Sequence, residues 1–216
     1  LEPAPPAEPP EPGNVVLGRF QPFHLGHAAL LTSVLDAISP ASVMVAIGSA
    51  NADRGPDDPW AAAERQEMIE AWAEGEDYSD RLLFVHIPDI DDPPNWVKHA
   101  EMYHGSSGVL HTSDVATGSL YEVAGWTIKS HELLCREDLV GWRVRATLKL
   151  TFAVPEEDAV QMILKESIPA VVIDWLSVGD RIKRLVLLDP DVERLGIDAC
   201  AELFASGEYN AKHRIV

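Results

Sequence analysis

Residues 14–38 of the sequence, NVVLGRFQPFHLGHAALLTSVLDAI, contain the pattern that decides the fold. The stretch NVVLG at 14–18, with its apolar run VVL, has the length and composition of a short buried strand. Apolar residues then recur at helical spacing, so a helix is expected over 27–38. Between strand and helix stands GRFQPFHLGH, 18–27, with two histidines three positions apart. The packing of a core does not require this combination of Gly, Arg and His, so the loop is a candidate ligand site.

The alternation of strand and helix continues beyond this first unit. Further strands are expected at 41–49, 81–89, 107–113 and 127–133, and further helices at 60–75, 96–105 and 118–125. Such alternation is typical of an α/β fold with a Rossmann-like parallel sheet and helices on both faces. Ligands of these sheets bind beyond the carboxyl ends of the strands. The site is therefore expected in the loops 18–27, 48–59, 89–96 and 112–118.

Three segments follow from composition and pattern. Residues 1–13, LEPAPPAEPPEPG, are rich in Pro and Glu and predict a disordered or polyproline-like lead. Residues 14–135 form the expected α/β core. Residues 136–216 read as a helical extension with a few interruptions, one of them at Pro155.

Charge and cysteine content limit the class of function. Lys and Arg number 17 against 35 Asp and Glu, a net charge of −18. A surface this acidic repels nucleic acids and anionic membranes, so neither is expected as a partner. The two cysteines fit no metal spacing and no disulfide framework, and no apolar run has membrane-spanning length, which predicts a cytoplasmic protein. The acidity fits either a high-salt cytoplasm or an ordinary acidic protein.

The chemistry of the first loop suits a phosphate. A helix N-terminus has unpaired N–H groups and partial positive charge, and glycines at 18 and 26 let a ligand approach the backbone closely. Imidazoles at His24 and His27 can donate hydrogen bonds to phosphate oxygens. Phe20 and Phe23 fit core packing better than stacking on a ligand.

The loop GRFQPFHLGH resembles the signature of the HxGH nucleotidyltransferases, and most closely that of archaeal-type nicotinamide-nucleotide adenylyltransferases. Other segments are similar to the same family: IGSANADRGPDDPWAAAER at 47–65, IPDIDDPPNWVKH at 87–99, HTSDVATGSLYEVAGWTI at 111–128 and REDLVGWRVRATL at 136–148. The resemblance covers about residues 14–180. It implies transfer of an adenylyl group from ATP to nicotinamide mononucleotide, with Mg²⁺ bound mainly through the ATP phosphates.

The resemblance also implies roles for individual residues. His24, His27 and Arg19 would be catalytic and would bind the ATP phosphates. The remaining ATP-binding residues would be Gly18, Phe20, Gly26, Gly141 and Arg145, so the helical extension would complete the ATP site. Arg54, Asn95 and Trp96 would bind the mononucleotide, with the indole stacked on the nicotinamide ring. Arg54 could instead be a solvated loop residue, and Trp96 could instead cover the core. The family also implies a homo-oligomer.

The chain departs from the family at its second phosphate motif. Val140-Gly141-Trp142 replaces Ser-Gly-Thr, and these two side chains cannot hydrogen-bond to phosphate. Trp142 could alternatively anchor the core. The departure leaves two other functions open: a nucleotidyltransferase with another acceptor, such as flavin mononucleotide or a phosphorylated alcohol, or a non-catalytic nucleotide-binding paralogue.

Overall fold

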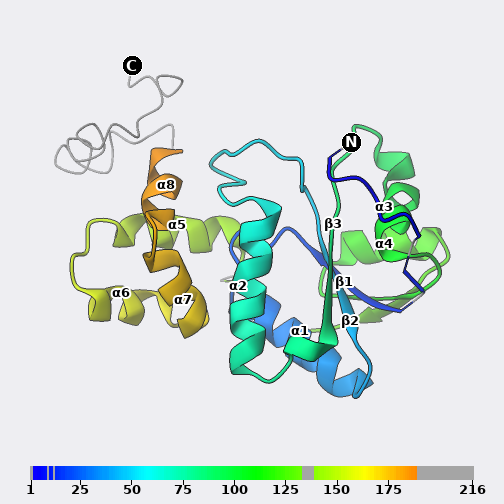
Figure 1. The fold of residues 1–216 in the computed structure, drawn as a ribbon, viewed down its shortest axis with the longest axis horizontal. Helices are drawn as coiled ribbons and strands as arrows, with labels where there is room; N and C mark the ends of the chain where they lie inside the picture. The colour runs from blue at the N-terminus through cyan, green and yellow to red at the C-terminus, as the bar shows by residue number, and fades with distance from the viewer. Residues whose placement is uncertain (1, 9, 12, 133–138, 189–216) are drawn as a thin grey trace.

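The computed structural model describes residues 2–8, 10–11, 13–132 and 139–188 (Figure 1). Five strands form one parallel sheet in the order β3-β2-β1-β4-β5. The strands are β1 (Asn14–Gly18), β2 (Val43–Ile47), β3 (Leu82–His86), β4 (Val109–Thr112) and β5 (Thr127–Ser130). Helices α1 (Leu25–Ile38), α2 (Ala62–Gly75), α3 (Trp96–His104) and α4 (Val115–Val123) connect them, with short 3-10 turns η1 (Ser79–Arg81) and η2 (Pro93–Asn95). The expected Rossmann-like α/β fold is confirmed.

Helices cover both faces of the sheet, because alternate strand residues point to opposite sides. Val16 and Val45 face one hydrophobic cluster, to which α1 and α2 contribute many of the helical side chains. Val15 and Ala46, one position away on each strand, face a second cluster that is built with α3 and α4. Strands buried on both sides explain why their sequences are nearly continuous apolar runs.

Helix starts differ from the expected ones because of local capping. Helix α1 begins at Leu25 rather than at 27, since His24 caps it and accepts a hydrogen bond from the Gly26 N–H group. Helix α4 begins at Val115 rather than at 118, since the Asp114 carboxylate accepts a hydrogen bond from the Thr117 N–H group. The first strand has its expected bounds, whereas the other four are shorter than expected at one or both ends. Part of the expected strand 127–133 lies outside the described residues.

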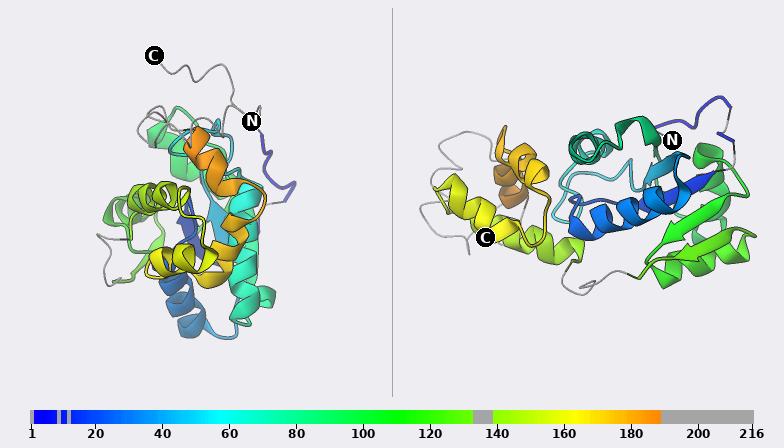
Figure 2. Two further views of the ribbon diagram at one scale, coloured as in Figure 1. Left: turned by 90° about the vertical axis from the view of Figure 1, so that its left-hand side faces the viewer. Right: turned by 90° about the horizontal axis from the view of Figure 1, so that it is seen from below.

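The helical extension contains α5 (Gly141–Thr151), α6 (Glu157–Leu164), α7 (Ala170–Ser177) and α8 (Arg181–Leu187). These helices lie at one end of the molecule, beside α2 and the loop that follows β1 (Figures 1 and 2). Their buried side chains, among them Leu148 and Val172, join the same cluster as α1 and α2. The extension is therefore continuous with the core. Residues 189–216 lie outside the described part of the chain.

The N-terminal lead touches the α3 and β4 side of the molecule. The Tyr103 hydroxyl donates to the Pro3 carbonyl at 2.9 Å, and the Val109 N–H group donates to the Gly13 carbonyl at 2.9 Å. Its described residues form no helix or strand. Disorder over 1–13 as a whole stays a prediction.

Candidate active site

The two loop histidines are locked by the backbone at the start of α1. Nδ1 of His24 accepts from the Gly26 N–H group at 3.2 Å, and Nδ1 of His27 accepts from the His24 N–H group at 3.3 Å. A neutral imidazole that accepts at Nδ1 has its proton on Nε2. Both rings can therefore present an Nε2–H donor to a ligand.

Burial keeps both imidazoles neutral. Their rings stack with centroids 3.7 Å apart, and Phe20 meets the His27 ring edge-on at 4.8 Å. Desolvation lowers the pKa of His24 to about 4. Desolvation and then the neighbouring His24 lower the pKa of His27 well below its usual value. At neutral pH the pair is thus a set of aligned dipoles rather than a pair of cations.

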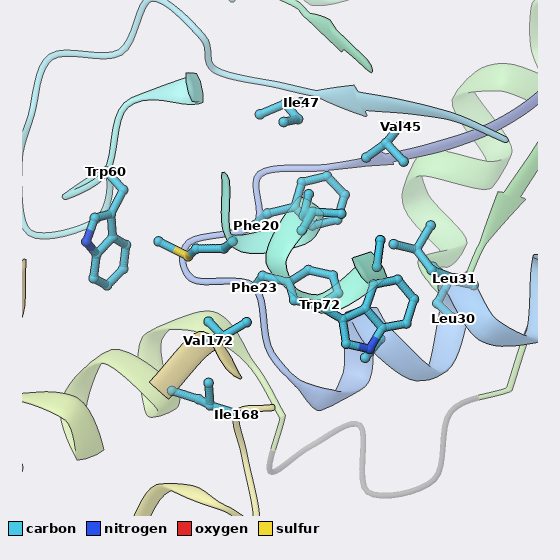
Figure 3. Close-up of a cluster of buried hydrophobic side chains, with 14 of the residues drawn as sticks. Phe20, Phe23, Leu30, Leu31, Val45, Ile47, Trp60, Trp72, Ile168 and Val172 are labelled. Atoms are coloured by element: carbon cyan, nitrogen blue, oxygen red, sulfur yellow. The ribbon is translucent and has the colours of Figure 1, made fainter. Parts of the chain in front are cut away.

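Two glycines of this loop lie closely against its aromatic rings. A Cβ atom at Gly18 would lie 2.9 Å from the Phe20 ring, and one at Gly26 would lie 3.1 Å from the His24 ring. Phe20 adopts a positive φ of 52°, which turns its ring back over Gly18. Phe20 and Phe23 are both buried in the core cluster, so the core interpretation of these residues is correct (Figure 3).

A cavity of about 450 Å³ lies between this loop and the start of α5. The first-loop residues that line it are Arg19, Phe20, Gln21, His24 and His27, and the others are Asp57, Val140, Gly141, Trp142 and Arg145. The structure therefore brings together residues from three distant stretches of sequence, including all three expected catalytic residues.

Arg145 connects these stretches. Its Nη1 donates to the Gln21 carbonyl at 2.9 Å, and its Nη2 pairs with Oδ1 of Asp57 at 2.6 Å. The Arg145 side chain is buried, whereas that of Asp57 is 80% exposed. Desolvation lowers the pKa of Arg145 from its usual value. A phosphate that entered the cavity could take the place of the exposed Asp57 carboxylate.

The departures at the start of α5 leave its backbone uncapped by side chains. Val140 is the N-cap residue and makes no side-chain hydrogen bond to the helix. Trp142 is 62% exposed, with the Arg143 guanidinium 5.3 Å from its ring centroid. The alternative that Trp142 anchors the core is therefore wrong.

The three expected mononucleotide residues lie outside this cavity lining. Arg54 pairs with Glu64 at 3.0 Å. Asn95 is exposed and donates to the Asp92 carboxylate at 2.8 Å. Trp96 is half-buried and contacts the Tyr121 ring edge-on at 6.3 Å, on the other hydrophobic cluster. All three belong to loops or helix starts that follow β2 and β3, at the carboxyl edge of the sheet.

A second cavity, of about 720 Å³, lies at the carboxyl ends of β4 and β5. Among its lining residues are Thr112, Asp114, Ser130 and His131. The rings of His131 and His111 are hydrogen-bonded at 3.0 Å. The strand order reverses between β1 and β4. The smaller cavity lies at the loop after β1 and the larger one at the end of β4, so the two cavities flank this boundary, as expected for a nucleotide crevice.

Two residues fix the shape of the site through contacts that the sequence does not predict. Arg65 is buried and donates to the carbonyls of Arg19, Gly48 and Ser49 at 2.6, 2.7 and 3.1 Å, which ties the loops after β1 and β2 together. The Gln21 amide exchanges two hydrogen bonds with the backbone of Trp60. The other partner of the Gln21 amide is the Asp58 carboxylate, which accepts from its Nε2 atom at 3.4 Å. The remaining partners are backbone groups, and these leave no pairing of residue types in the sequence.

Comparison with known proteins identifies the class. The cytidylyltransferase-like family model matches residues 15–106, the segment that runs from β1 to the end of α3. The chain is also similar to a solved bifunctional NMN adenylyltransferase/ADP ribose pyrophosphatase from Francisella tularensis, with a TM-score of 0.63 and 16% identity. This likeness covers 84% of the chain and 54% of that structure, so the chain spans about half its length, and it concerns the fold alone.

Curated relatives narrow the class further. A nicotinamide-nucleotide adenylyltransferase of Picrophilus torridus is 33% identical over 130 residues, which is 60% of this chain and 75% of the relative. One from Methanococcus aeolicus is 26% identical over 178 residues, which is 82% of this chain and 97% of the relative. The chain belongs to the nicotinamide-nucleotide adenylyltransferase family.

Proposed function

We propose that this protein transfers the adenylyl group of ATP to nicotinamide mononucleotide and releases NAD and pyrophosphate. The observation that carries the proposal is the pair of neutral, stacked imidazoles at the N-terminus of α1, each with its Nδ1 held by a backbone N–H group and its Nε2–H able to donate to a ligand. Family membership supports the same reaction, because the curated relatives carry that name.

The reaction needs alignment of two anions and stabilisation of charge at phosphorus. A 5′-phosphate oxygen of the mononucleotide attacks the α-phosphorus of ATP. The bond from that phosphorus to the bridging oxygen then breaks, and pyrophosphate leaves. His24 and His27 donate to phosphate oxygens as charge develops on them. Arg19, which is exposed at the cavity, and Arg145 supply positive charge in a chain whose net charge is −18.

We assign the polyphosphate of ATP to the smaller cavity and the nucleoside end to the larger one beyond β4 and β5. Gly18 and Gly26 permit the ring arrangement, and Gly141 lets the start of α5 approach the first loop: a Cβ there would lie 3.1 Å from the Gln21 carbonyl. Arg54, Asn95 and Trp96 hold the mononucleotide in this proposal.

Mg²⁺ enters the proposal as a companion of ATP. The described residues contain no group of three or more His, Cys, Asp or Glu side chains that could hold a metal ion. Magnesium keeps several waters and favours phosphate oxygens, so ATP can carry its own ion into such a site. When bound, the ion neutralises the leaving pyrophosphate.

Location and assembly complete the proposal. The described helices include none that is long and apolar enough to cross a membrane. A cytoplasmic location and a homo-oligomeric state remain predictions from the sequence and the family resemblance.

A second candidate is a non-catalytic nucleotide-binding protein, favoured by the absence of a hydroxyl at 140 and 142. The test is purified protein with ATP, Mg²⁺ and a panel of acceptors: nicotinamide mononucleotide, flavin mononucleotide and a phosphorylated alcohol. Pyrophosphate release and the mass of the product are measured together. NAD formed with nicotinamide mononucleotide supports the proposal. Product from another acceptor alone, or ATP binding with no pyrophosphate, refutes it.

A further inference from the structure

Glu64 is shared by two arginines that come from different parts of the fold. It lies in the first turn of α2, where its Oε2 accepts from the Ala61 N–H group at 2.9 Å. The same oxygen pairs with Nη2 of Arg54 at 3.0 Å, and its Oε1 pairs with Nη2 of Arg184 at 2.6 Å. Arg54 belongs to the loop after β2, and Arg184 belongs to α8. The last described helix therefore reaches the loop that contains Arg54.

The cluster has more positive than negative charge. Burial raises the pKa of Glu64, but hydrogen bonds from Arg184 and the Ala61 N–H group, with the charges of Arg184 and Arg54, bring it below its usual value. Glu64 is thus ionised at neutral pH. Two guanidinium groups around one carboxylate leave one positive charge, in a chain with a net charge of −18. Such a local excess is what an anionic substrate requires here.

The three side chains differ in their access to solvent. The side chain of Arg54 is 45% exposed, that of Arg184 31% and that of Glu64 17%. Arg54 is therefore the member that an incoming phosphate meets first, while Arg184 approaches the carboxylate through its other oxygen. The Nε atom of Arg184 is buried with no hydrogen-bond partner among the described residues. Both oxygens of the Glu64 carboxylate thus have partners, whereas one N–H group of Arg184 has none among the described residues.

We propose that Arg184 is a positioning residue for the acceptor phosphate: it shares the charge of Glu64 with Arg54, so that Arg54 can exchange this carboxylate for the phosphate of the mononucleotide. The inference rests on the proposed function, in which Arg54 meets that phosphate. Without Arg184, the Glu64 carboxylate keeps only Arg54 and the Ala61 N–H group as partners among the described residues. It then binds Arg54 more strongly, and the phosphate must compete with it for that guanidinium. Arg184 acts through another residue, so it should change acceptor affinity and leave ATP affinity and turnover largely intact.

The experiment compares two arginines of α8. Arg184→Gln is expected to raise KM for nicotinamide mononucleotide about five- to tenfold, since part of this ion pair is exposed to solvent. KM for ATP and kcat should change less than twofold. Arg181→Gln is the control on the same helix, because Arg181 also connects α8 to α2, through Glu67 at 3.8 Å. Arg181 lies over the Trp175 ring at 3.6 Å, and among the described residues its ion pair is with Glu67 rather than Glu64. Arg184→Lys, which keeps the charge, should keep most of the affinity.

A second pair of variants separates positioning from loss of structure. Glu64→Gln in the Arg184→Gln background removes the uncompensated charge and should restore the acceptor KM. Arg184→Gln in the Arg54→Gln background should add nothing further. Equal effects of Arg184→Gln and Arg181→Gln, or no restoration by Glu64→Gln, would overturn the inference. The proposed function fails separately, if the wild-type protein forms no NAD and does not bind nicotinamide mononucleotide in titration calorimetry.

Discussion

The imidazole rings of His24 and His27 are stacked 3.7 Å apart, and the Nδ1 atom of His27 faces the backbone N–H group of His24. The same His24 residue also caps α1 through its own Nδ1. His24 therefore has two roles: its Nδ1 atom caps α1, and its Nε2–H group can donate a hydrogen bond to a ligand. Substitution can separate the two.

We expect His24→Asn to abolish activity without loss of stability. Asparagine is a preferred N-cap residue and can accept from the Gly26 N–H group, but it does not reproduce the Nε2–H donor. Turnover should fall about a hundredfold or more, the scale for loss of one preorganised donor. His24→Ala should lose the same activity and also about 1 kcal/mol of stability. Initial rates and urea unfolding of both variants check this, and full activity in His24→Asn would contradict it.

The buried histidines predict a loss of stability in mild acid. In the unfolded chain His24 titrates near its usual pKa of 6.5, whereas in the folded protein its pKa is about 4. Between these values the unfolded state binds more protons, so the free energy of unfolding falls as the pH falls through this window. The contribution of His24 reaches about 3 kcal/mol at the acid end.

The measurement is urea unfolding of wild type and His24→Asn from pH 7.5 to 4.5. Residue 24 does not titrate in the variant, so its stability should depend less steeply on pH. Burial also lowers the pKa values of His27, His86, His104, His111 and His131, so these histidines give both proteins a slope of the same sign. Identical slopes in the two proteins would show that His24 has no such role.

Restoring hydroxyls at the start of α5 should tighten ATP binding. The double variant Val140→Ser with Trp142→Thr adds donors beside the cavity, and each hydrogen bond to a charged phosphate contributes roughly 1.5–3 kcal/mol. Because Trp142 is exposed, the melting temperature should change little. Titration calorimetry with ATP, together with thermal unfolding, checks both statements. Unchanged or weaker ATP binding in a well-folded variant would exclude this segment from the phosphate site.

Trp96→Ala should weaken mononucleotide binding and spare ATP binding. Loss of one stacking face costs about 1–3 kcal/mol in other proteins that stack bases on aromatic side chains. Trp142→Ala is a useful contrast, since it removes an indole that lines the cavity between the first loop and α5. Calorimetry with each ligand on both variants gives the answer. Equal weakening of both ligands by Trp96→Ala would mean that Trp96 only supports the core through its contact with Tyr121.

The sequence predicted the sheet well, because each strand is buried on both faces and reads as a short apolar run between turns. It also predicted the loop 18–27 as a candidate site, since the chemistry of that loop is local, and this assignment stays a prediction. Asp57 was not predicted, because its pairing with Arg145 joins positions 88 residues apart. Arg65 directly follows Glu64 in the sequence, yet it binds three carbonyl groups from the loops after β1 and β2 rather than that carboxylate. Long-range contacts to the backbone leave no pattern of residue types in a single sequence.

The contact between Arg145 and the Gln21 carbonyl, 124 positions apart, has a consequence for the order of events during synthesis. The first loop leaves the ribosome early, but the wall of its cavity arrives only with α5. The hydrophobic cluster behind that wall is completed later still, by α7 and α8. A growing chain therefore contains His24 and His27 before the residues of α5 that complete their cavity have been synthesised. Nucleotide capture in a cell-free translation reaction would accordingly report when the C-terminal helices have docked.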